Sequence, residues 1–176
     1  MKVSSKLLFG GRFLAFRRMG QWEYVERQNT SGCVAILAIT EDGEIILVEQ
    51  FRPPVQRRVI EIPAGLAGDV AGDQLETLID AAKRELLEET GYEAQGMERL
   101  TEGPSSAGLS TEVITFFRAQ GLRKMSEGGG VGSEIMMIHS IPLKGLRIWL
   151  DLKEREGCLI DYKIFAALYL AERILN

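Results

Sequence analysis

The chain has 176 residues, of which 45% are hydrophobic and 26% are charged, and its formal net charge is −4. This length suits one domain with a small appendage, and the composition is that of an ordinary globular protein that can bury a core. The acidic balance excludes a general attraction to nucleic acid, so we expect no nucleic-acid partner. An anionic substrate would need local positive charge or a metal.

The sequence contains no recognisable membrane span, signal peptide or zinc-binding motif. No apolar run approaches the ~20 residues of a membrane span, and the run Leu7-Leu8-Phe9 is too short for the core of a signal peptide. Cys33 and Cys158 are far apart, and neither belongs to a CxxC pair or lies beside a histidine. They are typical of reduced thiols. We therefore expect a cytoplasmic protein with no membrane partner.

Residues 1–30 are predicted to form two or three short antiparallel strands. Gly10-Gly11 and Met19-Gly20 mark turns, and the segment 21–27 alternates and contains the strand formers Trp22 and Tyr24. We expect a small N-terminal antiparallel β subdomain over 1–30, followed by the main domain over 31–176.

The main domain is predicted to mix strands and helices. Asp42-Gly43 is a hairpin signal between two apolar runs, and Pro53-Pro54 ends the second run. Strands are expected at 34–39, 45–50, 59–63, 98–103, 113–119 and 135–141, loops at 65–76, 103–112 and 126–132, and helices at 146–155 and 161–175. This order predicts the α+β class, with helices packed on a mixed sheet.

Another helix is predicted to run from Thr77 to Gly91. Thr77 and Asp80 form a capping pair, Asp73 and Glu76 are a second option, and Gly91 suits the residue that ends a helix. The apolar stripe of this helix is expected to comprise Leu78, Ile79, Ala82, Leu86 and, at its start, Leu75.

Three carboxylates gather at the end of this helix. Glu85 and Glu89 are four residues apart and therefore share one face, and Glu88 flanks them. Like charges at this spacing cost a few tenths of a kcal/mol per pair, so the cluster suggests a bound cation. Mg²⁺ is commonly held by one or two carboxylates together with substrate phosphates. The plainer alternative is a solvated acidic helix end.

The segment Arg84 to Tyr92, with Glu76 eight residues before Arg84, resembles the signature of the Nudix hydrolases, which cleave nucleoside diphosphates linked to another moiety. The segments 22–27, 49–54 and 61–65 resemble the ADP-ribose pyrophosphatase branch of that family. The resemblance implies the Nudix fold, an α/β/α sandwich around a mixed sheet. It also implies a hydrolase that depends on Mg²⁺, with Mn²⁺ as a substitute.

The resemblance also assigns the metal site. Glu85 and Glu89 match the metal-binding glutamates of the family. Glu88 matches a shared or bridging metal ligand that also has a catalytic role. The carbonyl oxygen of Ala64 matches a further metal ligand. Bound metals would neutralise the pyrophosphate, polarise its phosphoryl oxygens and lower the pKa of a water molecule.

Arg84 and Glu76 match positions that orient these carboxylates and the preceding loop; the alternative for Arg84 is an ordinary surface charge.

The sequence departs from the family signature in the loop before Glu76. Val70 stands six residues before Glu76, where the family has a glycine, whereas Gly65 lies eleven residues before it. A five-residue insertion explains this spacing. We expect the enlarged loop to affect the choice of substrate.

The general base is expected to be a glutamate on a loop. The resemblance favours Glu134, which follows the Gly-rich segment and would activate water from a loop that closes over the substrate. Glu112 is the main rival and is expected at the substrate or a metal, and Glu127 is a weaker rival. His139, the only histidine, lies in an apolar strand and is more typical of a structural residue.

Substrate contacts are expected from four further positions. Arg52 matches an arginine that contacts phosphate, for which the planar guanidinium is well suited. Gln50 and Glu61 belong to the matched segments and are expected at the substrate. Trp22 matches a position that stacks on adenine, often from the partner subunit of a homodimer. The alternatives are a surface arginine and a packed strand aromatic.

The sequence thus predicts an enzyme that hydrolyses the pyrophosphate bond of ADP-ribose or a related nucleoside diphosphate sugar, giving a nucleoside monophosphate and a sugar phosphate. GDP-mannose and other nucleoside diphosphate derivatives remain alternatives within the family. A non-catalytic Nudix-like domain that senses a nucleotide is an alternative of another class.

Overall fold

A computed structural model of the chain describes residues 4–68, 75–130 and 135–175. The strands are β1 (Lys6–Gly10), β2 (Leu14–Met19), β3 (Trp22–Arg27), β4 (Gly32–Leu37), β5 (Glu44–Arg52), β6 (Arg57–Glu61), β7 (Ala64–Ala67), β8 (Tyr92–Pro104), β9 (Val113–Lys124), β10 (Met137–Pro142) and β11 (Leu159–Ile160). The helices are α1 (Leu78–Thr90), α2 (Leu146–Arg155) and α3 (Lys163–Leu175), with 3-10 turns at η1 (Pro53–Val55) and η2 (Leu143–Gly145). None of the helices in these ranges is long and apolar enough to cross a membrane.

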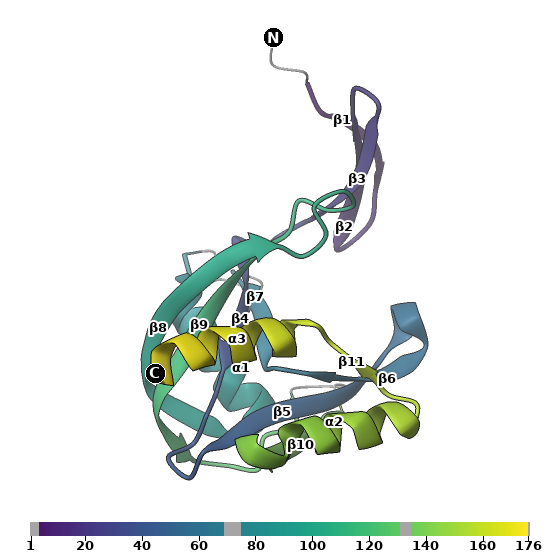
Figure 1. The fold of residues 1–176 in the computed structure, drawn as a ribbon. Helices are drawn as coiled ribbons and strands as arrows, with labels where there is room; N and C mark the ends of the chain where they lie inside the picture. The colour runs from purple at the N-terminus through teal and green to yellow at the C-terminus, as the bar shows by residue number, and fades with distance from the viewer. Residues whose placement is uncertain (1–3, 69–74, 131–134, 176) are drawn as a thin grey trace.

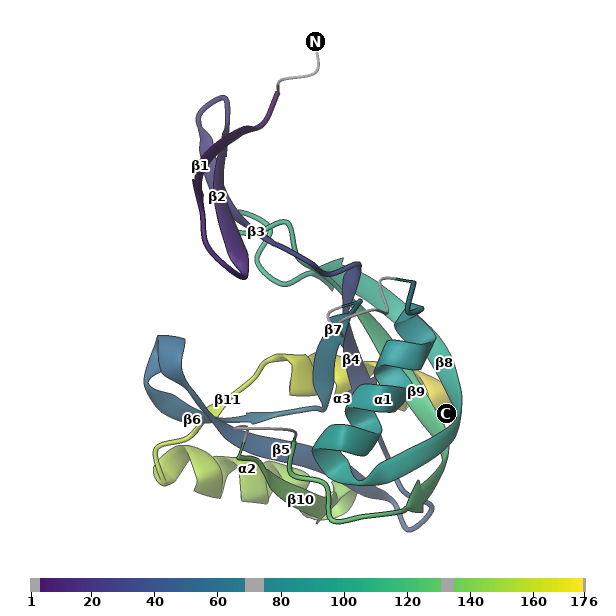
Figure 2. The ribbon, with the colours of Figure 1, turned by 180° about the vertical axis from the view of Figure 1, so that it is seen from behind.

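The body of the molecule is built from two four-stranded sheets between helices. Their strand orders are β7-β4-β9-β8 and β10-β5-β6-β11, with β4–β9 and β6–β11 parallel and the other pairs antiparallel. Helices α2 and α3 lie on the side that faces the viewer in Figure 1, and α1 lies on the opposite side, in front in Figure 2. The expected α+β sandwich is confirmed, with its mixed strands divided between two sheets.

Strand β4 shows why both sides of the body carry helices. Side chains alternate along a strand, so Val34 and Ile36 point one way and Leu37 the other. Val34 and Ile36 belong to the apolar cluster that contains Leu86 of α1, and Leu37 belongs to the cluster that contains Leu150 of α2. A strand that is apolar on both faces must be covered on both faces.

Several element boundaries differ from the sequence-based expectation. Residues 65–67 were expected to begin a loop but belong to β7 (64–67), because this segment pairs with 32–35 of β4. Strand β8 begins at Tyr92 rather than at 98, directly after Gly91, and runs antiparallel to β9. Strand β11 is two residues long and was not predicted. The insertion is predicted within the loop 66–75, of which 69–74 lie outside the described residues.

The ends of α1 match the sequence. The Thr77 hydroxyl accepts a hydrogen bond from the Asp80 amide at 3.2 Å, so this capping pair is the one used. Asp73, in the second option, lies outside the described residues. Gly91 ends the helix at φ 75°. The predicted apolar stripe was wrong at two positions: Leu75 is 93% exposed and Ile79 is also exposed, because the buried face turns through Ala81, Ala82 and Leu86 instead.

Strands β1, β2 and β3 form a separate antiparallel sheet, here called the arm (residues 6–27), which projects from the body in Figure 1. The arm is held by the loop 105–112, since the Val25 amide donates to the Leu109 carbonyl at 2.9 Å and the Thr111 amide donates to the Val25 carbonyl at 3.1 Å. Its exposed side chains include Phe9 and Trp22. The arm therefore presents apolar surface to solvent in the single chain.

Candidate active site

Strand β7 and helix α1 face one another at the centre of the site. The Ala64 amide donates to Glu89 Oε2 at 3.1 Å, and the Leu66 amide donates to Glu85 Oε1 at 3.3 Å. A Cβ atom on Gly65 would lie 1.9 Å from Cδ of Glu85. Only glycine leaves room for this approach, so the strand and the two carboxylates form one close-fitting unit.

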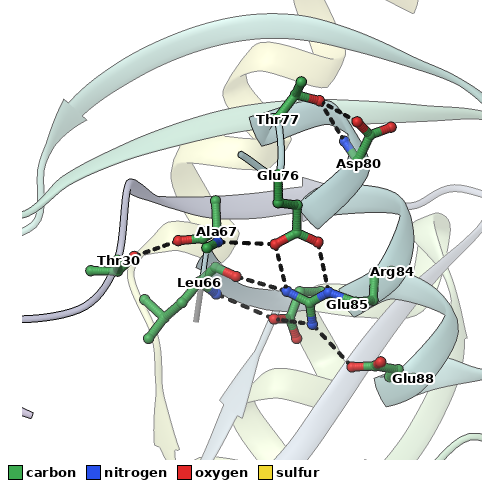
Figure 3. A network of polar contacts seen from close by, with 10 residues as sticks. Thr30, Leu66, Ala67, Glu76, Thr77, Asp80, Arg84, Glu85 and Glu88 are labelled. Atoms are coloured by element: carbon green, nitrogen blue, oxygen red, sulfur yellow. Dashed lines mark hydrogen bonds and ion pairs between the residues drawn. The ribbon is translucent and has the colours of Figure 1, made fainter. Parts of the chain in front are cut away.

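Arg84 organises the other end of this unit, as Figure 3 shows. Its guanidinium donates to both carboxylate oxygens of Glu76 at 2.8 and 3.2 Å, to Glu85 at 2.9 Å and to Glu88 at 3.1 Å. A further bond reaches the Leu66 carbonyl at 2.8 Å. Arg84 thereby ties the helix to β7 and to the residue before the helix, in the arrangement expected for a residue that orients Glu85.

Glu76 is held as an anion. Its hydrogen bonds from Arg84 lower its pKa below the ordinary value against the effect of burial, and the Gly68 amide at 3.0 Å adds to this effect. The same contact with Glu76 raises the pKa of Arg84 above the ordinary value. Glu76 and Arg84 therefore form a pair of opposite charges. Glu76 also accepts from the Gly68 amide, so the pair links the helix to the end of β7.

Glu89 lies in the opposite electrostatic situation. It is only 5% exposed, and burial raises its pKa to about 8, with the charges of Glu85 and Glu61 acting in the same direction. The Ala64 amide and Arg52 act against this shift but do not cancel it. A buried carboxylate crowded by other carboxylates is the environment that a cation would stabilise.

A cavity of about 420 Å³ opens between β7, α1 and the second sheet. It gathers seven predicted residues from five separate segments of the chain. Those residues are Gln50, Arg52, Glu61, Ala64, Glu85, Glu89 and Glu112. The structure therefore brings together most of the expected metal-binding and substrate-binding positions, although they span more than sixty residues of sequence.

Three predicted residues at or near the signature helix do not line the cavity: Arg84, Glu76 and Glu88. Arg84 bonds to both Glu76 and Glu85, and the orienting role of Arg84 and Glu76 stays a prediction. Glu88 bonds to Arg84 and does not line the cavity, so two carboxylates of the helix enter it rather than three. Accordingly, within the described ranges no three acidic, histidine or cysteine side chains converge as a metal site. Glu134 lies outside the described residues.

Two cations, Arg52 and Lys163, line the cavity together with the buried Glu61. Arg52 donates to Glu61 at 2.7 Å, and although burial acts to lower the pKa of Arg52, the bond to Glu61 holds it above the ordinary value. Lys163 lies 4.0 Å from the other oxygen of Glu61 and also pairs with Asp161. The buried Glu61 thus holds two cations on one side of the cavity.

Sequence reasoning missed Lys163 and Arg27 as cavity residues. Lys163 starts α3, 73 residues after the last residue of α1, and is positioned because β11 pairs with β6 at Ile160. Arg27 belongs to a matched segment but received no role; its guanidinium donates to Glu112 at 3.0 Å. No local spacing links either residue to the helix, so only the fold could reveal them.

Trp22 does not contact the cavity of its own chain. It is 66% exposed at the start of β3, five residues before Arg27, which corresponds to about 17 Å along a strand. Glu127 pairs with Lys124 and also lies outside the cavity. His139 bonds to Glu49 at 2.9 Å on another face of the sheet, as expected for a structural residue.

Comparisons with known proteins agree with this geometry. The NUDIX domain model matches residues 30–156. The methanol dehydrogenase activator of Bacillus methanolicus is 33% identical over 75% of this chain and 72% of that protein. The ADP-ribose pyrophosphatase of Bacillus subtilis (strain 168) is 42% identical over 54% of this chain and 49% of that protein.

Two further relatives extend the match. The GDP-mannose pyrophosphatase of Yersinia enterocolitica is 32% identical over 84% of this chain and 78% of that protein. A solved structure, "Crystal structure of ADP compounds hydrolase", aligns with a TM-score of 0.73 over 98% of this chain and 92% of that chain, and at 20% identity it shows the shared fold. Because the domain model covers most of the chain and relatives above 30% identity align with it at length, the chain belongs to the NUDIX domain family.

Proposed function

We propose that this Nudix hydrolase uses Mg²⁺ to hydrolyse the pyrophosphate bond of ADP-ribose or a related nucleoside diphosphate sugar. The products are a nucleoside monophosphate and a sugar phosphate. The observation that carries the proposal is the cavity that Glu85 and Glu89 line together with the cations Arg52 and Lys163. A diphosphate bound there would meet both a metal held by the glutamates and these two cations.

The donor set fits Mg²⁺. Glu85, Glu89 and the Ala64 backbone offer only oxygen ligands, which a hard divalent cation prefers. Burial, together with the charges of Glu85 and Glu61, raises the pKa of Glu89, and a bound cation would offset these effects. Mn²⁺ suits the same ligands. When bound, such a metal polarises phosphoryl oxygens and lowers the pKa of a coordinated water.

The residues of the chain supply binding and orientation. The fork of Arg52 is suited to a phosphate oxygen pair, and its bond to Glu61 holds it in place. Lys163 and Arg27 add positive charge at the cavity wall. Arg84 and Glu76 keep Glu85 in position from behind, as their hydrogen bonds suggest.

We propose Glu134 as the general base that takes the proton of the attacking water, with Glu112 as the alternative. Glu112 lines the cavity, and its carboxylate is already engaged by Arg27 at 2.9 Å. Comparing Glu134→Gln with Glu112→Gln in the pH dependence of kcat separates the two assignments, because only loss of the base removes the acidic limb.

The substrate class rests on relatives. Both an ADP-ribose pyrophosphatase and GDP-mannose pyrophosphatases align with the chain, so ADP-ribose is the first candidate and GDP-mannose the second. The exposed Trp22 is suited to stack on the base, since such stacking contributes roughly 1–3 kcal/mol. Because Trp22 does not reach the cavity of its own chain, we assign this contact to a partner subunit.

We accordingly propose a homodimer in which the arm packs on the second copy. Exposed apolar side chains gather on the arm, and contiguous apolar surface of this kind marks interaction sites. They are Leu7, Phe9, Phe13, Leu14 and Trp22. Light scattering should give twice the mass of 19.6 kDa at working concentration, and a monomer would contradict the assignment. A cytoplasmic location is proposed as well, supported by the free thiols of Cys33 and Cys158.

The decisive experiment measures hydrolysis of a nucleotide-sugar panel in ¹⁸O water, with and without Mg²⁺, and identifies products by mass. We expect metal-dependent release of a nucleoside monophosphate from ADP-ribose, with ¹⁸O in one of the two products. Glu89→Gln should abolish this release, while Glu93→Gln, an exposed control on β8, should not. Nucleotide binding without product release by the wild type would instead support a sensing domain.

A further inference from the structure

A second cavity lies between α2 and α3, the two helices that face the viewer in Figure 1. We call it the helix pocket; it has a volume of about 650 Å³, and its walls come from η2, α2, β11 and α3. None of its described lining residues also lines the catalytic cavity. The helix pocket is therefore a separate space, with a chemistry of its own.

The inner surface of the helix pocket is apolar. Leu146 and Leu150 of α2 are 3% and 5% exposed and belong to the core, and Ile160 of β11 and Leu168 of α3 pack against the same core. The pocket thus reaches down to the hydrophobic core of the body. An apolar cavity of this size with a few polar groups is typical of sites for small molecules.

Charged side chains surround this apolar floor, and most of them are acidic. The charged lining residues, all exposed, are Arg147, Asp151, Glu154 and Glu172. Asp151 and Glu154 lie three residues apart and therefore share one face of α2. Within the ranges that the structure describes, neither of these two carboxylate groups has a hydrogen-bond or ion-pair partner. A positively charged ligand complements them, whereas an anion has only Arg147 to meet.

These two acids lie toward the end of α2 that leads into β11. The Cys158 amide donates to the Lys153 carbonyl at 3.0 Å, so the chain turns directly from α2 into β11 and then into α3. Because α2 and α3 run in opposite directions (Figure 1), the start of α3 lies beside this end of α2. The first turn of α3 contributes Phe165 to the pocket. An aromatic face attracts a cation that lies within about 6 Å of the ring centre.

We propose that the helix pocket is a binding site for an amphipathic cation, a small molecule with an apolar body and one ammonium group. The apolar body packs on Leu146 and Leu150 at the floor. The ammonium group lies at the acidic end, where Asp151 and Glu154 supply negative charge and Phe165 supplies a ring face. Neither a nucleotide nor a metal takes part, so this binding is independent of the proposed function.

The helix pocket is linked to the catalytic cavity through α3 and β11. Lys163 starts α3 and lines the catalytic cavity, and Phe165, two residues later, lines the helix pocket. Ile160 of β11 lines the helix pocket and pairs with Ile60, the neighbour of the cavity residue Glu61. A ligand between the helices gives α3 new packing contacts and holds it in one position.

We therefore expect a filled helix pocket to favour substrate binding beside Lys163, because the first ligand has already ordered the helix that carries this side chain. This effect on the substrate rests on the proposed function, whereas the binding of the cation does not. The two parts of the inference are tested separately.

The binding test uses three probes that share one apolar body: 4-phenylbutylamine, 4-phenylbutanol and 4-phenylbutyrate. Titrations are followed by NMR on the leucine methyl groups of the pocket. We expect the ammonium probe to bind about fivefold more tightly than the alcohol, since each exposed ion pair contributes up to a few-fold in affinity, and the carboxylate probe to bind most weakly. In the double variant Asp151→Asn/Glu154→Gln, the ammonium probe should bind no more tightly than the alcohol.

The matched control is Glu98→Gln/Glu102→Gln on β8, which removes two exposed carboxylates away from both cavities and should keep the wild-type order of affinities. Equal affinities of the three probes for the wild type, or an ammonium preference that survives in the Asp151/Glu154 double variant, would overturn the site. Loss of the preference in Glu89→Gln alone would place the cation in the catalytic cavity and would overturn the site as well.

The link between the two cavities is measured as the KM for ADP-ribose with Mg²⁺, over a series of 4-phenylbutylamine concentrations. We expect the probe to lower KM by about fivefold in the wild type. The probe concentration that gives half of this effect should rise about fivefold in Asp151→Asn/Glu154→Gln. An unchanged or raised KM in the wild type would overturn the link. If the wild type hydrolyses no ADP-ribose, the proposed function fails, and the probe titrations, which contain no nucleotide, still decide whether the helix pocket binds the cation.

Discussion

Two buried glutamates of this fold lie in opposite electrostatic environments. Glu49 on β5 is 2% exposed, and Glu89 on α1 is 5% exposed. Glu49 is met by Arg58, by His139 at 2.9 Å and by Lys153 at 3.2 Å. Although burial acts to raise its pKa, these bonds hold the pKa of Glu49 below the ordinary value.

Among the residues that the structure describes, no comparable set of cations meets Glu89. Burial and two neighbouring carboxylates raise its pKa to about 8, against the weaker effects of the Ala64 amide and Arg52. A buried carboxylate that is paired with several cations can contribute to the stability of the fold. A buried carboxylate that is crowded by other carboxylates is suited to bind a cation. The contrast supports the proposed metal-binding role of Glu89, and it does so without reference to sequence motifs.

The largest effect is expected from Glu89→Gln. Removing one ligand of the catalytic metal should lower kcat by about 100-fold to 10,000-fold, or about 3–5 kcal/mol of barrier. Without metal, the variant should be at least as stable as the wild type at pH 9. Because the folded-state pKa of Glu89 is raised, the stability that protonated Glu89 contributes to the wild type is fully present below pH 4.5. It is lost as the pH rises through about 8.

Kinetics with Mg²⁺ and thermal unfolding in EDTA measure these two effects. A variant that keeps wild-type turnover would remove Glu89 from the metal site. A variant that unfolds well below the wild type at pH 9 would show that Glu89 is structural, like Glu49.

Glu49→Gln should show the reverse pattern. Breaking a buried charged network leaves its cations unmatched and costs about 3–5 kcal/mol of stability. The wild-type contribution of Glu49 is present above pH 4.5 and is lost as the pH falls through its lowered folded-state value, so the difference between the two proteins should shrink in acid. Urea unfolding at pH 7 and pH 3 measures both quantities.

Turnover per folded molecule should stay within a few-fold of the wild type in Glu49→Gln, because Glu49 does not line the cavity. The exposed Glu98→Gln is the matched control and should change stability by less than about 0.5 kcal/mol. A large loss of turnover in folded Glu49→Gln would break the proposed division of roles.

Gly65→Ala tests how closely the functional carboxylates are held. The new Cβ would lie 1.9 Å from Cδ of Glu85, so either the side chain or β7 must move. We expect a loss of about tenfold to 100-fold in kcat, since small misplacements of catalytic groups are costly. Gly103→Ala, where a Cβ meets nothing within 4 Å, is the control. Equal activity in both variants would mean that Glu85 tolerates displacement.

The smallest effect concerns Cys33, which lies in the same cavity. Burial raises its pKa to about 11, and Glu112 adds to the shift. At pH 8 the thiol should therefore react with iodoacetamide far more slowly than a free cysteine. Glu112→Gln should accelerate the reaction a few-fold, which peptide mass spectrometry can follow. An unchanged rate would show that burial alone suppresses the thiolate.

Much of the site was predictable because its central part is local in sequence. Thr77, Gly91 and the four-residue spacing of Glu85 and Glu89 define the helix and place both carboxylates on one face. The segments around Arg52 and Ala64 added two more cavity residues. The extent of the apolar stripe was not predictable, because packing against β4 and β8 decides which side of a helix is buried.

The sequence by itself determined the family, the capped helix and the acids available to hold a metal, since these depend on residues within a few turns of one another. Tertiary structure alone decided that Glu88 turns to Arg84 while Glu89 enters the cavity, that Lys163 and Arg27 join it, and that Trp22 does not. It also decided which buried glutamate meets cations. Charges on distant strands become neighbours only when the sheets form, and short-range spacing carries no information about them.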